Sequence, residues 1–304
     1  MSVRELVVIS GKGGTGKTSV LASFAALAAN AVLADCDVDA ADLHLVMAPE
    51  VRRREEFVSG REAVIRQGEC IRCGACLALC RFEAVITDGL PAGQASFLVN
   101  PTACEGCGVC VRFCPARAID FPERLCGEWF VSDTRFGPMV HARLKAAAEN
   151  SGKLVSTVRR EARRLAEESG RELVLIDGPP GIGCPVISSV TGASLVLVVS
   201  EPTLSGRHDL ERVLGLARHF GIPAMAAVNK ADINPEAADA IERFCLERGV
   251  AFAGRVPYDP AVTRAQIAGR SVVEFPGDGA AAEAIREIWG RVAARLAEVD
   301  GVGA

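Results

Sequence analysis

The chain has 304 residues, of which 49% are hydrophobic and 24% are charged, as in an ordinary folded protein. Its formal net charge of -4 provides no basic surface for a phosphate backbone, so nucleic acid is excluded as a default partner. No run approaches the roughly 18 apolar residues of a membrane span. We expect a cytoplasmic protein without stable membrane insertion.

The beginning of the chain has the pattern of a strand, a glycine-rich loop and a helix. Residues 6–10 are a continuous apolar run, and residues 18–29 are an Ala-rich helical stretch. Between them, residues 11–18 fit G-x-x-x-x-G-K-[ST], in which backbone N–H groups and the lysine bind phosphates while the hydroxyl binds Mg²⁺. The pattern predicts a nucleotide site with Lys17 as a catalytic residue and Thr18 as a metal ligand. The predicted binding residues are Gly11, Gly13, Gly14, Thr15, Gly16, Lys17, Thr18 and Ser19.

Three carboxylates follow the next apolar run, which covers residues 31–34. They belong to Asp35, Asp37 and Asp39. Carboxylates so close together repel one another unless a cation or a lysine lies among them. The segment therefore indicates a metal site.

The middle of the chain interrupts this alternation of apolar strands and helices. A charged stretch at residues 52–56 precedes two Cys-rich segments. We predict an inserted domain at residues 62–122, between two parts of a nucleotide-binding domain at residues 1–61 and 123–304.

Eight of the 12 cysteines lie in this insert, in two C-x-x-C-x-x-C-x-x-x-C runs. Such runs place soft thiolates at the spacing that iron–sulfur clusters require, which favours cluster ligation over disulfides. A structural zinc site is the alternative. The first run is Cys70, Cys73, Cys76 and Cys80, and the second is Cys104, Cys107, Cys110 and Cys114.

Apolar runs return at residues 173–176, 195–199 and 224–228, with helical patterns between the later ones. The alternation predicts an α/β fold, in which helices cover both faces of a doubly wound, mostly parallel sheet. The first of these runs ends in Asp177 and the third in Asn229 and Lys230. A last helical pattern, which contains Trp289, is expected to pack on the sheet.

The segment Lys12–Thr18 resembles the deviant Walker A motif of the MinD/Mrp/ParA and nitrogenase iron protein superfamily, whose mark is an extra lysine early in the loop. Lys12 occupies that place. In that superfamily the extra lysine crosses to the nucleotide of a dimer partner during γ-phosphoryl transfer. The resemblance implies that Lys12 is catalytic in a nucleotide-sandwich dimer, either a homodimer or a heterodimer with a paralogue.

The same resemblance implies roles for several carboxylates and for the base-binding residues. Asp37 positions the attacking water, with Asp39 as its rival, while Asp35 lies in the outer Mg²⁺ shell and Asp177 holds Mg²⁺ through water. Residues 178–181 form a switch that moves with the γ-phosphate. Asn229 and Pro257 contact adenine.

The paired cysteine runs resemble those of bacterial two-cluster ferredoxins, which implies a small α+β insert. In such ferredoxins the fourth cysteine of each run serves the other cluster. One cluster would therefore take Cys114, and the other would take Cys80. A proline, Pro115, follows the second run as the pattern asks, but Arg81 follows the first.

Four cysteines lie outside the runs. Cys184 resembles a residue of the nitrogenase iron protein that binds an interfacial cluster, and a small buried residue is the alternative. Cys36 and Cys245 are expected to be packing residues, and Cys126 is a weak candidate partner for Cys184.

The resemblance implies an ATPase that couples ATP binding and hydrolysis to electron transfer, with ATP, Mg²⁺ and two [4Fe–4S] clusters as cofactors. A redox or Fe–S acceptor protein would be its partner. One alternative is an Fe–S scaffold or carrier of the Mrp type. Another is a MinD/ParA-like spatial organiser whose clusters sense redox state.

Overall fold

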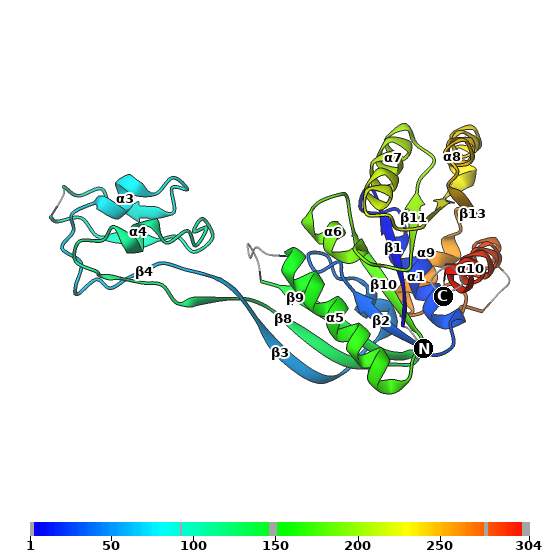
Figure 1. Cartoon of the computed structure of the whole chain (residues 1–304), viewed down its shortest axis with the longest axis horizontal. Helices are drawn as coiled ribbons and strands as arrows, with labels where there is room; N and C mark the ends of the chain where they lie inside the picture. Colours follow the sequence, from blue (N-terminus) through cyan, green and yellow to red (C-terminus); the bar gives the residue numbers. More distant parts are fainter. Residues whose placement is uncertain (1–2, 92, 146–150, 277–278, 300–304) are drawn as a thin grey trace. The chain divides into compact units, whose positions relative to one another are not determined.

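The computed structural model describes residues 3–91, 93–145, 151–276 and 279–299. The chain forms two compact units (Figure 1). The first comprises residues 1–55, 129–143 and 151–304, and the second comprises residues 56–128 and 144–150. The second unit contains the whole range 62–122 that the sequence analysis assigned to an insert, and it extends beyond both ends of that range.

A nine-stranded sheet organises the first unit. Its central strands are parallel and buried on both faces, which explains why they appear in the sequence as continuous apolar runs. The parallel α/β architecture expected from the sequence is therefore confirmed. In spatial order the strands are β13 (Ala251–Val256), β12 (Ala224–Asn229), β11 (Leu195–Ser200), β1 (Arg4–Ser10), β10 (Leu173–Pro180), β2 (Ala31–Asp35), β9 (Gly137–Leu144), β8 (Glu123–Thr134) and β3 (Glu50–Arg61).

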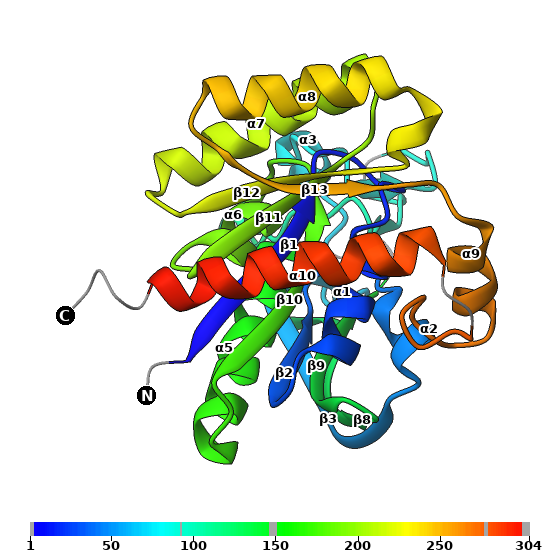
Figure 2. The same cartoon turned by 90° about the vertical axis from the view of Figure 1, so that its right-hand side faces the viewer.

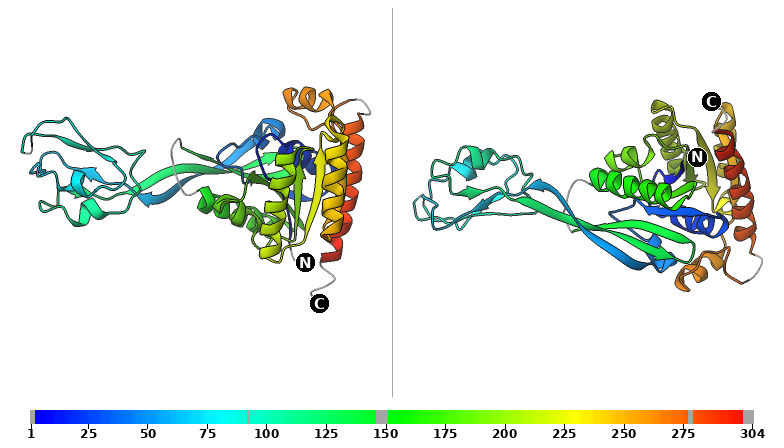
Figure 3. Two further views of the ribbon diagram at one scale, coloured as in Figure 1. Left: turned by 90° about the horizontal axis from the view of Figure 1, so that it is seen from above. Right: turned by 60° about the horizontal axis from the view of Figure 1, so that its bottom comes forward.

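Helices cover both faces of this sheet. On one face, α1 and α10 pack over a core that includes Phe24 and Ile285 (Figure 2). On the other face, α5, α6 and α7 contact β2, β10 and β11 (Figure 3). The edge strand β13 is contacted by both α8 and α10. The helices are α1 (Lys17–Leu27), α2 (Leu43–Met47), α5 (Ser151–Ser169), α6 (Cys184–Val190), α7 (Leu204–His219), the 3-10 helix η1 (Ala231–Ile233), α8 (Pro235–Glu247), α9 (Pro260–Ile267) and α10 (Ala280–Val299).

The C-terminal helix packs as the sequence predicts. Ile288 and Val292 of α10 are buried in the core, and the Trp289 ring lies 5.0 Å from the Phe24 ring. The apolar stripe of α10 is therefore occupied by the sheet and by α1.

Four strands of this sheet, β3, β8, β9 and β13, were missed by the sequence analysis. Residues 52–56, which appeared only as a charged stretch, lie within the twelve-residue strand β3, and β8 and β9 follow the cysteine runs. Most residues of β3 are exposed, so the strand lacks the buried alternation by which strands are recognised. Both β3 and β8 begin in one unit and end in the other.

The second unit repeats one small motif twice. The first copy is β4 (Val64–Ile65), α3 (Ala75–Leu79) and β5 (Val85–Thr87), and the second is β6 (Phe97–Val99), α4 (Val109–Arg112) and β7 (Ile119–Asp120). The outer strands β4 and β7 pair with each other, as do the inner strands β5 and β6, both in antiparallel fashion. Exchanging the two copies preserves this pairing, so the unit has the pseudo-twofold arrangement that its sequence repeat suggests.

Phe24→Ala tests the packing of α1 on α10. The substitution deletes a fully buried ring and is expected to lower the free energy of unfolding by ~3–5 kcal/mol. The matched control, Leu204→Ala, removes a side chain that is 89% exposed, so the free energy of unfolding should change by less than about 0.5 kcal/mol. Urea unfolding measures both, and similar values for the two variants would contradict the packing described.

Candidate functional site

The phosphate loop lies between β1 and α1, as its sequence pattern requires. Gly16 has a φ of 89°, which favours glycine, and a Cβ there would lie 2.3 Å from Nδ2 of Asn229. That amide donates a hydrogen bond of 2.8 Å to the carbonyl of Thr15. The loop is therefore closed onto the end of β12 at a point where no side chain fits.

Lys17 lies among the buried carboxylates. Its Nζ is 2.5 Å from Oδ2 of Asp37 and 3.9 Å from Oδ1 of Asp177. Burial lowers the pKa of Lys17, but the charges of Asp177 and Asp37 outweigh this and raise it above its ordinary value. The ammonium is thus held in its charged form at the site where the loop would bind phosphate.

The sheet brings two of these carboxylates side by side. Asp177 and Asp35 are register partners at the ends of the parallel strands β10 and β2. Thr18 Oγ1 donates 2.7 Å to Oδ2 of Asp177, and the amide of Asp37 donates 3.1 Å to Oδ1 of Asp35. The remaining oxygens, Oδ2 of Asp35 and Oδ1 of Asp177, are buried and accept no hydrogen bond within the part of the chain that the structure describes.

Both acids are consequently hard to ionise. Burial raises the pKa of Asp35 well above its ordinary value, and the charge of Asp177 adds to the effect. Burial also raises the pKa of Asp177 to about 6, although Lys17 and Thr18 oppose the shift. A hydroxyl and carboxylate oxygens without hydrogen-bonding partners are ligands that Mg²⁺ accepts, so these residues fit a magnesium site.

A cavity of about 710 Å³ opens beside the phosphate loop, within the range of small-molecule sites. Gln266, which the sequence analysis did not select, also lines it together with Tyr258, and Gln266 donates 2.8 Å to Oγ of Ser19. The lining of this cavity includes nine of the predicted residues: Gly13, Gly14, Gly16, Lys17, Thr18, Ser19, Asp37, Asn229 and Pro257.

Other predicted residues lie outside that lining. Gly11 packs against α7, where a Cβ would lie 2.2 Å from Cβ of Asp209, and Asp39 is exposed. Of the two candidates for positioning the attacking water, only Asp37 lines the cavity.

Lys12 forms an ion pair that the sequence analysis missed. Its Nζ lies 3.0 Å from Oε2 of Glu201, which follows β11 directly. A signal was present, because the carboxyl ends of parallel strands meet at the edge where the phosphate loop lies. A carboxylate that directly follows a buried strand was therefore a candidate neighbour of the loop.

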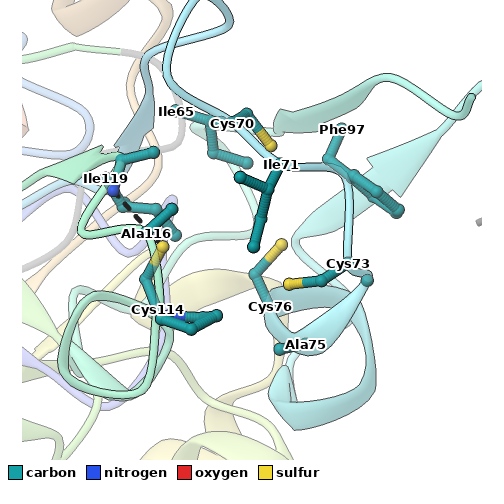
Figure 4. Close-up of a pocket in the computed structure, with 13 residues that line it drawn as sticks. Ile65, Cys70, Ile71, Cys73, Ala75, Cys76, Phe97, Cys114, Ala116 and Ile119 are labelled. Atoms are coloured by element: carbon teal, nitrogen blue, oxygen red, sulfur yellow. Dashed lines mark hydrogen bonds between the residues drawn. The ribbon is translucent and has the colours of Figure 1, made fainter. Parts of the chain in front are cut away.

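Four cysteines from both runs of the second unit line one cavity: Cys70, Cys73, Cys76 and Cys114 (Figure 4). Ile65, Phe97 and Ile119 contribute apolar walls. The amide of Ala118 donates 3.3 Å to the sulfur of Cys114, a contact that stabilises negative charge on a thiolate. By their chemistry, the soft sulfur donors, the apolar walls and the N–H donor to sulfur suit an iron–sulfur cluster.

The remaining cysteines of the two runs lie in the same unit. Burial raises the pKa of Cys110, and the charges of Cys104 and Cys107 add to it, as between neighbouring thiols. Burial also acts to raise the pKa of Cys80, but the backbone N–H groups of residues 82–85 outweigh it and lower that pKa. Cys80 is thus a thiol whose surroundings favour the thiolate.

Cysteines outside the two runs differ in exposure. Cys36, Cys126 and Cys245 are buried, whereas Cys184 is exposed, so its alternative interpretation as a small buried residue is wrong.

Within the described residues 3–91, 93–145, 151–276 and 279–299, no group of three or more His, Cys, Asp or Glu side chains is placed to hold a metal ion.

Asp177→Asn tests the electrostatic account of the carboxylates. Because the pKa of Asp177 is about 6 in the folded chain and 3.8 ordinarily, folding binds a proton between these values and stability falls as pH rises through them. Without nucleotide and Mg²⁺, the variant should be more stable than the wild type by roughly 1–3 kcal/mol at pH 7.5, with the difference vanishing near pH 4. Urea unfolding across this pH range measures it.

The exposed acid Glu247 provides the control, since Glu247→Gln should leave the pH profile unchanged. An Asp177→Asn variant that is less stable than the wild type at pH 7.5 would contradict the account.

Comparisons with known proteins identify relatives of this chain. The chain is 34% identical to Uncharacterized protein MJ0578 of Methanocaldococcus jannaschii over 235 residues, which cover 76% of this chain and 80% of the relative. It is 28% identical over 146 residues to an iron-sulfur cluster carrier protein of Pyrococcus furiosus, covering 43% of this chain and 48% of that one.

Among solved structures, the septum site-determining protein MinD of Pyrococcus horikoshii, complexed with Mg-ADP, has a similar fold. The TM-score is 0.56 at 16% identity, over 95% of this chain and 96% of the other. No helix in the described part of the chain is both long and apolar enough to pass through a membrane. Residues 6–272 match the CobQ/CobB/MinD/ParA nucleotide binding domain, and the chain belongs to this family of P-loop proteins.

Proposed function

We propose that this protein hydrolyses ATP in a nucleotide-bridged dimer and couples that cycle to electron transfer through two [4Fe–4S] clusters in the second unit. The observation that carries the proposal is the cavity lined by Cys70, Cys73, Cys76 and Cys114 in a chain whose other unit is a nucleotide-binding domain. Cys114 is distant in sequence from the other three. Its presence in their cavity is the arrangement that a shared two-cluster domain requires.

In the nucleotide-binding unit, the phosphate loop and the neighbouring carboxylates would have different roles. The N–H groups at the start of α1 would bind the phosphates, and Lys17 would exchange Asp37 for the β- and γ-phosphate oxygens. Asp37, once released, lies in the cavity and is free to orient the attacking water. Mg²⁺, held by Thr18 and by Asp177 and Asp35 directly or through water, would neutralise phosphate charge.

Lys12 would supply the remaining positive charge from the partner subunit, as an arginine finger does. Its side chain is 36% exposed, so it is accessible to a second chain. Whether the partner is a second copy of this chain or a paralogue, the site in one subunit would be incomplete without the other.

On the redox side, we assign Cys70, Cys73, Cys76 and Cys114 to one cluster and Cys104, Cys107, Cys110 and Cys80 to the other. Bound clusters would supply one-electron chemistry to an acceptor protein. The apolar walls of the first cavity would keep water from the sulfurs and so adjust the potential.

A direct structural connection supports coupling between the two functions. Arg135, in the turn between β8 and β9, donates hydrogen bonds of 3.0 and 3.2 Å to the carbonyls of Val46 and Met47 at the end of α2. Val46 lines the nucleotide cavity. Since α2 leads into β3, and β3 and β8 both continue into the second unit, movement of α2 would reach both connecting strands.

An Fe–S carrier is the second candidate function. The similarity to the carrier protein of Pyrococcus furiosus favours it, although it covers less than half of either chain. A carrier would release its clusters to an apo-acceptor, whereas the proposed electron-transfer protein would retain them. Intact transfer to an apo-ferredoxin, followed by its absorption spectrum, would favour the carrier.

Lys12→Ala tests the dimer. Loss of the trans lysine is expected to abolish ATP-dependent dimerisation and to lower the rate of ATP hydrolysis by at least about 100-fold. Sedimentation velocity and phosphate release measure the two effects. Lys153→Ala, on the exposed side of α5, is the control and should behave as the wild type. A fully active Lys12→Ala dimer would remove the sandwich proposal.

Iron content tests the cluster assignment. Anaerobically purified protein is expected to hold about eight iron atoms per chain, as two cubanes do. Cys73→Ala and Cys107→Ala should each lose about half of this iron, because each removes a ligand of one cluster. Cys245→Ala, a cysteine of α8 that lies outside the runs, should lose none. Zinc in place of iron, or equal effects of all three variants, would contradict the assignment.

A further inference from the structure

Glu201 occupies a fixed position at the edge of the phosphate loop. Its carbonyl accepts a 2.8 Å hydrogen bond from the amide of Thr203, and Thr203 caps α7 by accepting 2.9 Å from the amide of Gly206. A Cβ on Gly206 would lie 2.3 Å from the carbonyl oxygen of Glu201, so the turn is closely packed. The Glu201 side chain is only 16% exposed. Its carboxylate is therefore held by the fold and screened from much of the solvent.

Two lysines share this carboxylate. Oε2 lies 3.0 Å from Nζ of Lys12, and Oε1 lies 2.6 Å from Nζ of Lys230. Burial acts to raise the pKa of Glu201, but Lys230 and Lys12 outweigh it and hold that pKa below its usual value. Each oxygen has its own ammonium, so the carboxylate pairs with both lysines at once.

Lys230 would keep this carboxylate paired when Lys12 leaves. Its Nζ also donates 3.3 Å to the carbonyl of Gly14, and it follows Asn229, whose side chain is bonded to the carbonyl of Thr15. Removing one partner of a buried pair is costly mainly because it leaves the other charge unpaired. Here Glu201 would retain Lys230, so release of Lys12 costs no more than the Lys12–Glu201 pair itself.

We propose that Glu201 is a positioning residue that holds Lys12 on its own subunit and so restrains dimerisation until the lysine is exchanged for the partner's nucleotide. The inference rests on the trans role of Lys12 under the proposed function. Reaching a phosphate in another subunit would draw the Nζ of Lys12 away from Glu201, which it now contacts at 3.0 Å. Dimer formation must therefore break this pair once in each chain that supplies the lysine.

The experiment measures the dimer dissociation constant by sedimentation velocity, with saturating ATP analogue that is not hydrolysed. Glu201→Gln keeps the shape of the side chain but removes its charge. A partly exposed ion pair that must be broken raises the dimer dissociation constant by up to about 5-fold. Because a homodimer breaks two such pairs, the variant should dimerise up to about 25-fold more tightly. Glu211→Gln, which breaks only a surface pair between α7 and Arg248, is the control and should match the wild type.

A third variant and a second measurement separate this role from a general loosening of the site. Lys12→Ala with Glu201→Gln should not dimerise, because the gain depends on the freed lysine. The affinity of the monomer for a fluorescent ATP analogue should change less than about 3-fold in Glu201→Gln, since Lys230 and Asn229 still bond the loop.

Dimerisation of Glu201→Gln that is no tighter than that of Glu211→Gln would overturn the inference. So would a gain that persists without Lys12. If Lys12→Ala alone dimerises normally, the proposed sandwich itself fails, whatever Glu201→Gln does.

Discussion

The buried charge at the ends of β2 and β10 is the constraint on which the site depends. Parallel register forces Asp35 and Asp177 to be neighbours, and both are fully buried. Asp37 adds a third carboxylate, and Lys17 is the only ammonium within ion-pair distance of any of the three among the described residues. A site with this imbalance favours a divalent cation, which supports the proposal that a nucleotide binds there together with Mg²⁺.

Under the proposed function, the same charge arrangement would let the nucleotide act as a switch. Lys17 pairs with Asp37 and Lys12 pairs with Glu201, so both lysines are held by carboxylates of their own chain. Phosphates compete for both lysines, one in the same subunit and one in the proposed partner. Binding therefore rearranges charge at the end of β2, next to α2 and the strands that lead to the second unit.

Much of the first unit could be predicted because its signals are local. A buried parallel strand needs a continuous apolar run, and a phosphate loop needs its glycines and lysine within a few residues, as in Gly11–Thr18. The cysteine runs likewise carry their spacing in the sequence. The choice of Asp37 over Asp39 depended on resemblance, because two carboxylates so close in sequence differ only in the direction of their side chains.

What could not be predicted depends on contacts between distant segments. Strand β3 carries charged residues because it is mostly exposed, so its sequence lacks the alternation of apolar and polar residues that predicts a strand. The pairing of Lys12 with Glu201 joins residues 189 positions apart, and only the strand order places them together. The hydrogen bonds from Arg135 to the end of α2 could not be predicted for the same reason. Arg135 lies in a turn after a strand that the sequence did not reveal, so no neighbour could be expected for it.

The central claim is that the nucleotide and the clusters influence each other, and the midpoint potential of the clusters tests it most directly. An EPR-monitored redox titration of the anaerobic protein, with ATP and with ADP, should show potentials that differ by at least about 60 mV, a tenfold change in a one-electron equilibrium. The Lys17→Ala variant, which lacks the phosphate-binding ammonium, should show no difference. Equal potentials in a wild-type protein that demonstrably binds both nucleotides would contradict the account.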